Sequence, residues 1–506
     1  MKYIAPAETI KKIDEKINAI GEISPLVLIY VRTGNLCDAA KRIQIFKSDP
    51  IFHELVSSMS TKLDTDGIVK AVARYFRYVM FSHTWEGKEP TFQDVSEKSV
   101  YELDPHPLNH KLRCFCETVR DDPEGYLWAW SDTCCIDKTI ETVYRKSIRS
   151  MYNWYKESTL TIVLLAHGPT STLKNNRWMT RAWTLQELLS PKSIRFYNRD
   201  WELYQGDTWR NHKESPHIMQ ELAEAIDVVK DTLVDFSPAS LGIRAKLRLA
   251  STREATEKVD IAYALIGIFS SDLIPEYRDP EDALGLLLQE IVHRERDAKA
   301  VLDWIGKSSQ FNSCLPAQIL AYQDSPYTPP PIPENVMEAR VAELRALLPQ
   351  RDVTMFFENI SALGSTDFTH RRLSLPCITF PVSVDTARYD EASLASNQSV
   401  VYQAQAAALG ELEFKTLCTT FTTKDEVVLV HPWIRDLLAQ TNLPEWDTYT
   451  RALRLVVHLE QPFRALLLVK QSVDTYKRVA VDNEILIPQR QVMSLKDIST
   501  KVLEIR

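Results

Sequence analysis

The sequence of 506 residues lacks several features that would place it in a special class of protein. Glycine is scarce, at 13 residues, so neither a collagen-like repeat nor a glycine-rich flexible chain is expected. No run of eighteen apolar residues occurs, so no membrane span is expected. Hydrophobic residues make up 44% of the chain and charged residues 25%, which is typical of globular proteins. At this length we expect two or three folded domains.

An excess of positive charge is also missing, since the formal net charge is −8. A protein whose main partner is nucleic acid usually carries a basic surface, so nucleic acid is not an expected partner. The eight cysteines are few and irregularly spaced, which favours free thiols in a reducing compartment over a disulfide framework. No apolar segment typical of a secretory signal follows Met1. Together these features predict a cytoplasmic location.

Motifs for metals and nucleotide phosphates give little signal. Two histidines and two cysteines lie between residues 106 and 116, but the Cys-x-Cys spacing and the lack of a second cysteine pair do not fit common zinc sites. No metal is therefore expected. The sequence contains no Gly-x-x-x-x-Gly-Lys-Ser/Thr motif, so a P-loop is excluded as well.

The pattern of apolar residues divides the chain into four parts. Residues 1–72 carry isoleucines at helical spacing and are predicted to be helical. Residues 73–307 alternate β-branched runs with amphipathic segments, which predicts an α/β fold with a parallel sheet flanked by helices. A proline-rich linker is expected at 308–335, and a β-rich α+β domain at 336–506. The strands expected in the two sheets are Tyr78–Phe81, Tyr126–Trp130, Leu160–Leu165, Ser193–Tyr197, Cys377–Val382, Glu426–Val430, Leu453–Val457 and Ala465–Val469.

Polar loops follow the first two of these strands. Ser82, His83 and Trp85 come directly after Phe81, and Asp132 comes shortly after Trp130. Ligands bind at the carboxyl ends of strands in parallel sheets, so we expect the chemistry in these loops. Ser82 is a candidate to bind a phosphate or a ribose, Trp85 to stack on a base, and Asp132 to hold a hydroxyl. The alternatives are that Ser82 and Asp132 cap turns, that His83 is an ordinary hydrogen-bonding residue, and that Trp85 fills the core.

Three blocks in this region resemble the motifs of the fungal heterokaryon-incompatibility (HET) domain. A fourth block resembles the sequence that follows these motifs in the family, and the resemblance covers residues 72–300. Two departures stand in the first block, where His83 replaces a common Tyr and the usual Gly is displaced to Gly87. The resemblance implies an effector or signalling protein of non-self recognition and programmed cell death. It also implies a protein partner or self-association. The four blocks are residues 78–85, 127–137, 177–189 and 250–269.

A fainter resemblance is to Toll/interleukin-receptor (TIR) domains, which have the same order of elements. Their Trp-x-x-x-Glu-Leu helix is similar to the segment from Trp183 to Leu188. The Glu of this helix cleaves NAD in some TIR domains. The resemblance therefore implies that Glu187 is a catalytic carboxylate and that NAD or a related nucleotide is a substrate, with no cofactor. It further implies a TIR-like HET domain in which Ser82, His83, Trp85, Asp132 and Trp183 bind that ligand.

This chemistry needs few groups. Cleaving the bond between nicotinamide and ribose develops positive charge on the ribose, which a carboxylate stabilises. Trp183 and Glu187 are four residues apart, on one face of a helix. The alternative for Glu187 is a structural ion pair with Arg181 or Arg195. The alternative for the whole domain is a non-catalytic interaction module that signals by self-association.

Overall fold

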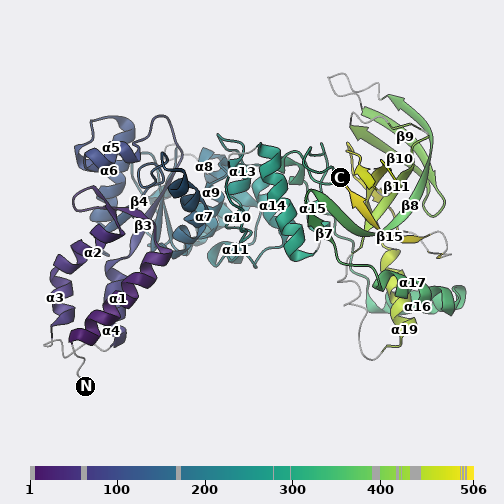
Figure 1. The fold of residues 1–506 in the computed structure, drawn as a ribbon, viewed down its shortest axis with the longest axis horizontal. Coiled ribbons are helices and arrows are strands. Elements are labelled where there is room, and N and C mark those ends of the chain that lie inside the picture. Colours follow the sequence, from purple (N-terminus) through teal and green to yellow (C-terminus); the bar gives the residue numbers. More distant parts are fainter. Residues whose placement is uncertain are drawn as a thin grey trace. The chain divides into compact units, whose positions relative to one another are not determined.

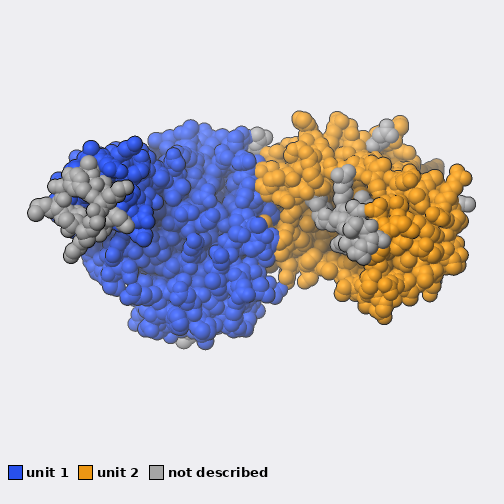
Figure 2. Space-filling model, turned by 90° about the horizontal axis from the view of Figure 1, so that it is seen from below, with its two compact units in different colours: residues 1–241, 253–277 blue, residues 242–252, 278–506 orange. Residues whose placement is uncertain are grey.

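The structure is a computed structural model in which the chain forms two compact units. One unit consists of residues 1–241 and 253–277, and the other of residues 242–252 and 278–506 (Figure 2). The residues that the structure describes are 6–57, 65–166, 172–276, 279–296, 298–389, 399–417, 421–422, 424–433, 446–473, 475–489, 492, 495 and 498–506.

Six strands among the described residues of the first unit form one sheet, in the order β2-β1-β4-β3-β5-β6. The pairs β4–β3, β3–β5 and β5–β6 are parallel, whereas β1 is antiparallel to both β2 and β4. The sheet is therefore mixed, whereas the sequence predicts a parallel sheet. Its strands are β1 (Val27–Tyr30), β2 (Asn35–Asp38), β3 (Tyr78–His83), β4 (Trp128–Trp130), β5 (Leu160–Leu164) and β6 (Ile194–Tyr197).

The antiparallel hairpin of β1 and β2 corrects the prediction that residues 1–72 are all helical. Both strands have four residues, too few for an alternating pattern to be read from the sequence. β1 becomes a strand because it pairs with β4 from a distant part of the chain. Gly34 closes the turn with φ of +75°, and a Cβ at this position would lie 2.9 Å from the ring of Tyr101. The helices of this region are α1 (Pro6–Ile23), α2 (Ala39–Ser48), α3 (Pro50–Val56) and α4 (Thr65–Tyr75).

Alternation along β3 determines which helix each of its side chains meets. Tyr78 points to α7, where its hydroxyl donates to the Trp154 carbonyl at 2.8 Å. Phe81 points to the opposite face, where its ring stacks on Phe115 of α6 with centroids 4.4 Å apart. Figure 1 shows α5 and α6 on one side of β3 and β4, and α7 to α9 on the other. The remaining helices of this unit are α5 (Phe92–Glu97), α6 (Pro107–Arg120), α7 (Glu141–Glu157), α8 (Arg177–Thr180), α9 (Thr184–Leu189), α10 (Pro216–Ile226), α11 (Lys230–Val234), α13 (Asp260–Tyr263), and the 3-10 turns η1 (Val100–Glu102), η2 (Leu173–Asn175) and η3 (Tyr204–Gly206).

The second unit contains a nine-stranded sheet of the described residues, ordered β10-β9-β8-β11-β12-β13-β15, with β14 beside β12 and β7 beside β8. Helices α16, α17 and α19 share a buried apolar core with this sheet. The strands are β7 (Asp367–Thr369), β8 (Arg372–Tyr389), β9 (Ser399–Ala406), β10 (Gly410–Leu417), β11 (Val427–Pro432), β12 (Phe463–Lys470), β13 (Thr475–Arg478), β14 (Ile485–Ile487) and β15 (Ser499–Ile505). The helices are α12 (Ile243–Ser251), α14 (Pro280–Glu295), α15 (Lys299–Leu302), η4 (Ile319–Tyr322), α16 (Glu334–Leu347), α17 (Gln350–Ser361) and α19 (Thr448–Leu459).

Two predictions for this part of the chain need correction. The expected strand Leu453–Val457 lies inside α19, which Asp447 caps by accepting a hydrogen bond from the Thr450 amide at 2.6 Å. A continuous apolar run does not distinguish a buried strand from a buried helix, and the cap decides for the helix. The expected linker, residues 308–335, lies within the second unit. Its Asn312 amide donates to the Ile505 carbonyl at 2.9 Å, which ties it to β15.

No helix of the described residues combines the length and the apolar character that crossing a lipid bilayer requires.

Two helical glycines test how tightly the units are packed. A Cβ at Gly285 of α14 would lie 2.3 Å from the Phe311 ring, whereas one at Gly21 of α1 meets nothing within 4 Å. We expect Gly285→Ala to lower the free energy of unfolding by about 1–3 kcal/mol through overpacking. The matched change Gly21→Ala is expected to raise it by roughly 0.5 kcal/mol, because alanine favours the helix. Urea denaturation measures both, and equal effects of the two variants would contradict the packing described here.

Candidate functional site

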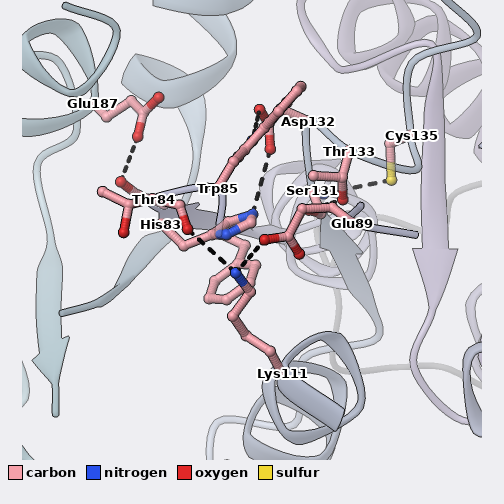
Figure 3. Close-up of polar contacts among 12 residues, drawn as sticks. His83, Thr84, Trp85, Glu89, Lys111, Ser131, Asp132, Thr133, Cys135 and Glu187 are labelled. Atoms are coloured by element: carbon pink, nitrogen blue, oxygen red, sulfur yellow. Dashed lines mark hydrogen bonds and ion pairs between the residues drawn. The ribbon is translucent and has the colours of Figure 1, made fainter. Parts of the chain in front are cut away.

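Glu187 lies in α9 and points back at the carboxyl end of β3. Its side chain is buried, with 7% of the residue exposed. The Ser82 hydroxyl donates a hydrogen bond to a carboxylate oxygen of Glu187. Figure 3 shows the Glu187 carboxylate in one view with His83, Trp85 and Asp132. The Trp178 indole donates to the same Ser82 oxygen at 2.7 Å. Ser82 is thus held on one side by a donor and on the other by the acid, so its position at the end of the sheet is fixed.

The ion pair considered for Glu187 is not formed. Arg195 pairs with Asp122 at 2.6 Å, and Arg181 donates to the Thr256 hydroxyl at 3.1 Å. Among the described residues, no cation lies within 4.0 Å of the Glu187 carboxylate. The buried Arg253 guanidinium, which belongs to the fourth sequence block, acts on Glu187 through its charge at longer range.

Burial raises the pKa of Glu187 to about 8, and the negative charge of Asp132 adds to this effect. The hydrogen bond from Ser82 and the charges of Arg181 and Arg253 act in the opposite direction. Burial also lowers the pKa of Arg253 to about 10. A carboxyl group with a pKa near 8 exchanges its proton close to neutral pH, which is a property of general acids and bases.

A second polar group lies on the other side of the loop after β3. The Trp85 indole donates to Asp132 at 3.0 Å, and His83 Nε2 lies 3.6 Å from the other carboxylate oxygen of Asp132. Although burial opposes it, contact with His83 and the charge of Lys138 hold the pKa of Asp132 below its usual value. Trp85 is 43% exposed, so the expectation that it fills the core is wrong. The Lys138 ammonium instead lies over the Trp85 ring, 4.0 Å from its centroid, in a cation–π contact.

A cavity of about 440 Å³ opens at the carboxyl ends of β3 and β5. In the order β4-β3-β5-β6 the chain first moves from β3 to β4 and then crosses to β5, so the direction of winding reverses between β3 and β5. Such a reversal is where open α/β sheets bind ligands. The lining includes His83, whose ring nitrogens are buried without a hydrogen-bond partner. Glu187 is not among the lining residues.

The structure therefore divides the expected site residues into separate groups. Ser82 contacts Glu187, while His83 and Trp85 contact Asp132. Trp183 joins neither, because its indole donates to Asp260 of α13 at 3.0 Å. Among the lining residues of the cavity that the sequence did not predict are Lys111 of α6 and Arg199 and Trp201 of the loop after β6.

A backbone feature marks one of the missed residues. Trp201 has φ of +61°, which is strained for a bulky side chain, and its ring lies 5.9 Å from that of Phe81. No local sequence pattern predicts this conformation.

Trp178 and Arg253 do lie within two of the blocks that carry the family resemblance, so those blocks contain the signal that could have found them.

Comparison with known proteins gives a family match within this unit. Residues 78–172 match the family described as Heterokaryon incompatibility protein (HET). This segment carries a HET domain. The chain is also 29% identical over 230 residues to "Vegetative incompatibility protein HET-E-1" of Podospora anserina. That alignment covers 42% of this chain and 16% of the relative, so the chain corresponds to a small part of that protein. No solved structure matches.

The matched segment of the HET domain contains β3, β4 and β5 with both polar loops. Glu187 lies beyond its end at residue 172. The domain therefore supplies Ser82, His83, Trp85 and Asp132, and the chain that follows supplies the buried carboxyl group.

The raised pKa of Glu187 predicts how the stability of the HET-domain unit depends on pH. Below pH 4.5, the ordinary pKa of Glu, the folded and unfolded chains both hold the proton, so Glu187 costs nothing. As the pH rises from 4.5 to about 8, the unfolded chain releases the proton while the folded chain keeps it, and stability falls. Glu187→Gln cannot lose a proton. We expect this variant to be more stable than the wild type near pH 8, by on the order of 3 kcal/mol, and similar to it near pH 4.5.

Thermal unfolding of both proteins across this pH range measures the difference. Glu224→Gln, an exposed acid on α10 of the same unit, is the matched control and should follow the wild type at every pH. A constant difference between Glu187→Gln and wild type over the whole range would show that the Glu187 pKa is ordinary.

Proposed function

We propose that this protein acts in non-self recognition of the heterokaryon-incompatibility type and that its HET domain cleaves NAD, with Glu187 as the catalytic carboxylate. Cell death would follow from the loss of NAD. The observation that carries this proposal is the state of Glu187: a buried carboxyl group that has no ion-pair partner among the described residues and has a pKa raised to about 8. A group of this kind beside a ligand-binding edge is a candidate for function and not for simple packing.

The position of the cavity supports a nucleotide ligand. Four strands follow the order of a doubly wound sheet, and the cavity of about 440 Å³ lies where the winding reverses, which is the usual place for nucleotides. The TIR likeness belongs to this proposal, because TIR-like domains share the doubly wound arrangement. Arg199 lines the cavity and could supply positive charge toward a phosphate, whereas Lys111 is paired with the buried Glu89.

The charge of the substrate gives Glu187 its role. The nicotinamide ring of NAD carries a positive charge, which favours the ionised carboxylate when the two come close. When the bond from ribose to nicotinamide breaks, nicotinamide leaves as a neutral molecule and the positive charge moves to the ribose, where the carboxylate stabilises it. Water then adds to the ribose and releases a proton. Substrate binding would replace the contact of Ser82 with Glu187, while Trp178 keeps Ser82 in place.

One observation favours a second function. Glu187 is 7% exposed and does not line the cavity, so a ligand reaches it after the Ser82 contact opens. If that contact never opens, the HET domain is a non-catalytic interaction module that signals by self-association. Both functions fit a role in non-self recognition.

Release of nicotinamide from NAD by the purified full chain separates the two functions. We expect kcat/KM to rise with pH, to reach half its maximum near pH 8 and to level at higher pH, because the free protein must lose the Glu187 proton before the carboxylate acts. Glu187→Gln should lower the rate by about 100-fold or more. Glu224→Gln, which removes an equal charge from the surface of the same unit, should leave it unchanged.

Two outcomes contradict parts of this proposal. Turnover that survives Glu187→Gln would reject Glu187 as the catalytic residue but keep the activity. No turnover at protein concentrations at which the chain self-associates would reject the activity and leave the interaction module.

A further inference from the structure

A separate cavity of about 630 Å³ lies between the outer face of α7 and residues 266–274, within the first unit. It shares no lining residue with the cavity at β3 and β5, and it does not include Glu187. Its lining is cationic although the whole chain carries a net charge of −8. The four cations are Arg145, Lys146, Arg149 and Lys156.

The spacing of these residues makes the charge local. Arg145, Arg149 and Lys156 follow at intervals of four and seven residues, so they lie on one face of α7 with Asn153 among them. Like charges at such spacing repel each other, which destabilises the helix by a few tenths of a kcal/mol per pair. A sequence selected for stability alone would not gather them.

Few acids balance these cations. Asp272 is the single acid in the lining and lies 3.8 Å from Arg149, and it is fully solvated. Arg145 pairs with Glu141 at 2.5 Å on the exposed surface of the helix. Lys146 and Lys156 make no hydrogen bond or ion pair with the described residues. Four cations less Asp272 and less the Glu141 that pairs with Arg145 leave a local charge of about two, which attracts an anion.

The floor of the cavity supplies an independent observation. Tyr152 is 5% exposed, and its hydroxyl is buried without a hydrogen-bond partner. Gly267 packs against it so closely that a Cβ there would lie 2.1 Å from the Tyr152 Cβ. Buried hydroxyls normally have a partner, so the Tyr152 hydroxyl, behind the lining of this cavity, lacks the acceptor that such a group usually has.

We propose that this cavity binds a small molecule that carries several phosphate groups. Its volume lies within the range of small-molecule sites, and a polyphosphate matches three or four cations along one helix face. Arginine binds phosphate oxygens through two parallel hydrogen bonds, and lysine adds charge. This site is independent of Glu187 and of NAD cleavage, and it gives the HET-domain unit a second ligand.

Inorganic tripolyphosphate tests this proposal with the full-length protein, because it carries the charge of such a ligand without a base or sugar. We expect saturable binding in isothermal titration calorimetry and a rise in the unfolding temperature of the first unit. The double variant Lys146→Gln with Arg149→Gln should weaken binding at least about tenfold. Sulfate at equal ionic strength should not compete.

A matched pair of variants controls for charge. Lys11→Gln with Lys41→Gln removes two exposed cations from the same unit but far along the chain, and it should leave binding unchanged. Equal weakening in both double variants would show unspecific attraction and overturn the proposal, as would the absence of saturable binding. Lys146→Gln alone, at an exposed position, keeps the test valid if Arg149 proves necessary for folding, and it should weaken binding several-fold.

Discussion

The hydrogen bond between Ser82 and Glu187 is the interaction on which the candidate site depends. It joins the carboxyl end of β3 to α9, a helix 105 residues later in the chain. The bond forms in a buried place where no cation of the described part of the chain contacts the carboxylate, so burial keeps the proton on the acid to an unusually high pH. Any role of Glu187 in chemistry follows from this balance, since a partner of opposite charge would have fixed it in its ionised form.

Alternation along β3 explains why the expected site has two parts. Neighbouring side chains of a strand point to opposite faces, so Ser82 meets α8 and α9 while His83 stacks on Phe81 above α6. The acid and the cavity thus lie on different sides of the same strand. The loop that follows, with Trp85 and Asp132, connects them at the edge of the sheet.

The sequence predicts the parallel strands of the first unit well because each is a short buried run between clear breaks. Periodicity places β3, β4, β5 and β6 within a residue or two of their observed bounds. It fails at β1 and β2, since β1 pairs with β4 and β2 pairs with β1, and at α19, where the cap at Asp447 decides for a helix. Among the candidate residues, Ser82 of the first block contacts Glu187 of the third block. The separation of Trp183 from Glu187 could not be predicted, since it depends on Asp260.

The two cavities show what motif-based reasoning leaves out. Lys111, Arg199 and Trp201 enter the first cavity from elements without a recognisable motif. The cations of the second belong to an amphipathic helix whose pattern indicates only a solvated face. Both sites arise when distant segments pack together, and the residues that allow this packing, such as Gly267 beside Tyr152, carry no local signal.

Direct observation of the Glu187 proton tests the central claim most closely. In protein labelled with ¹³C at the glutamate carboxyl carbons, the Glu187 resonance can be assigned by its loss in Glu187→Gln and followed by NMR as the pH changes. We expect this resonance to titrate near pH 8, well above those of exposed glutamates. Titration near the ordinary value of 4.5 would contradict the buried, unpaired state of this carboxyl group and the function built on it.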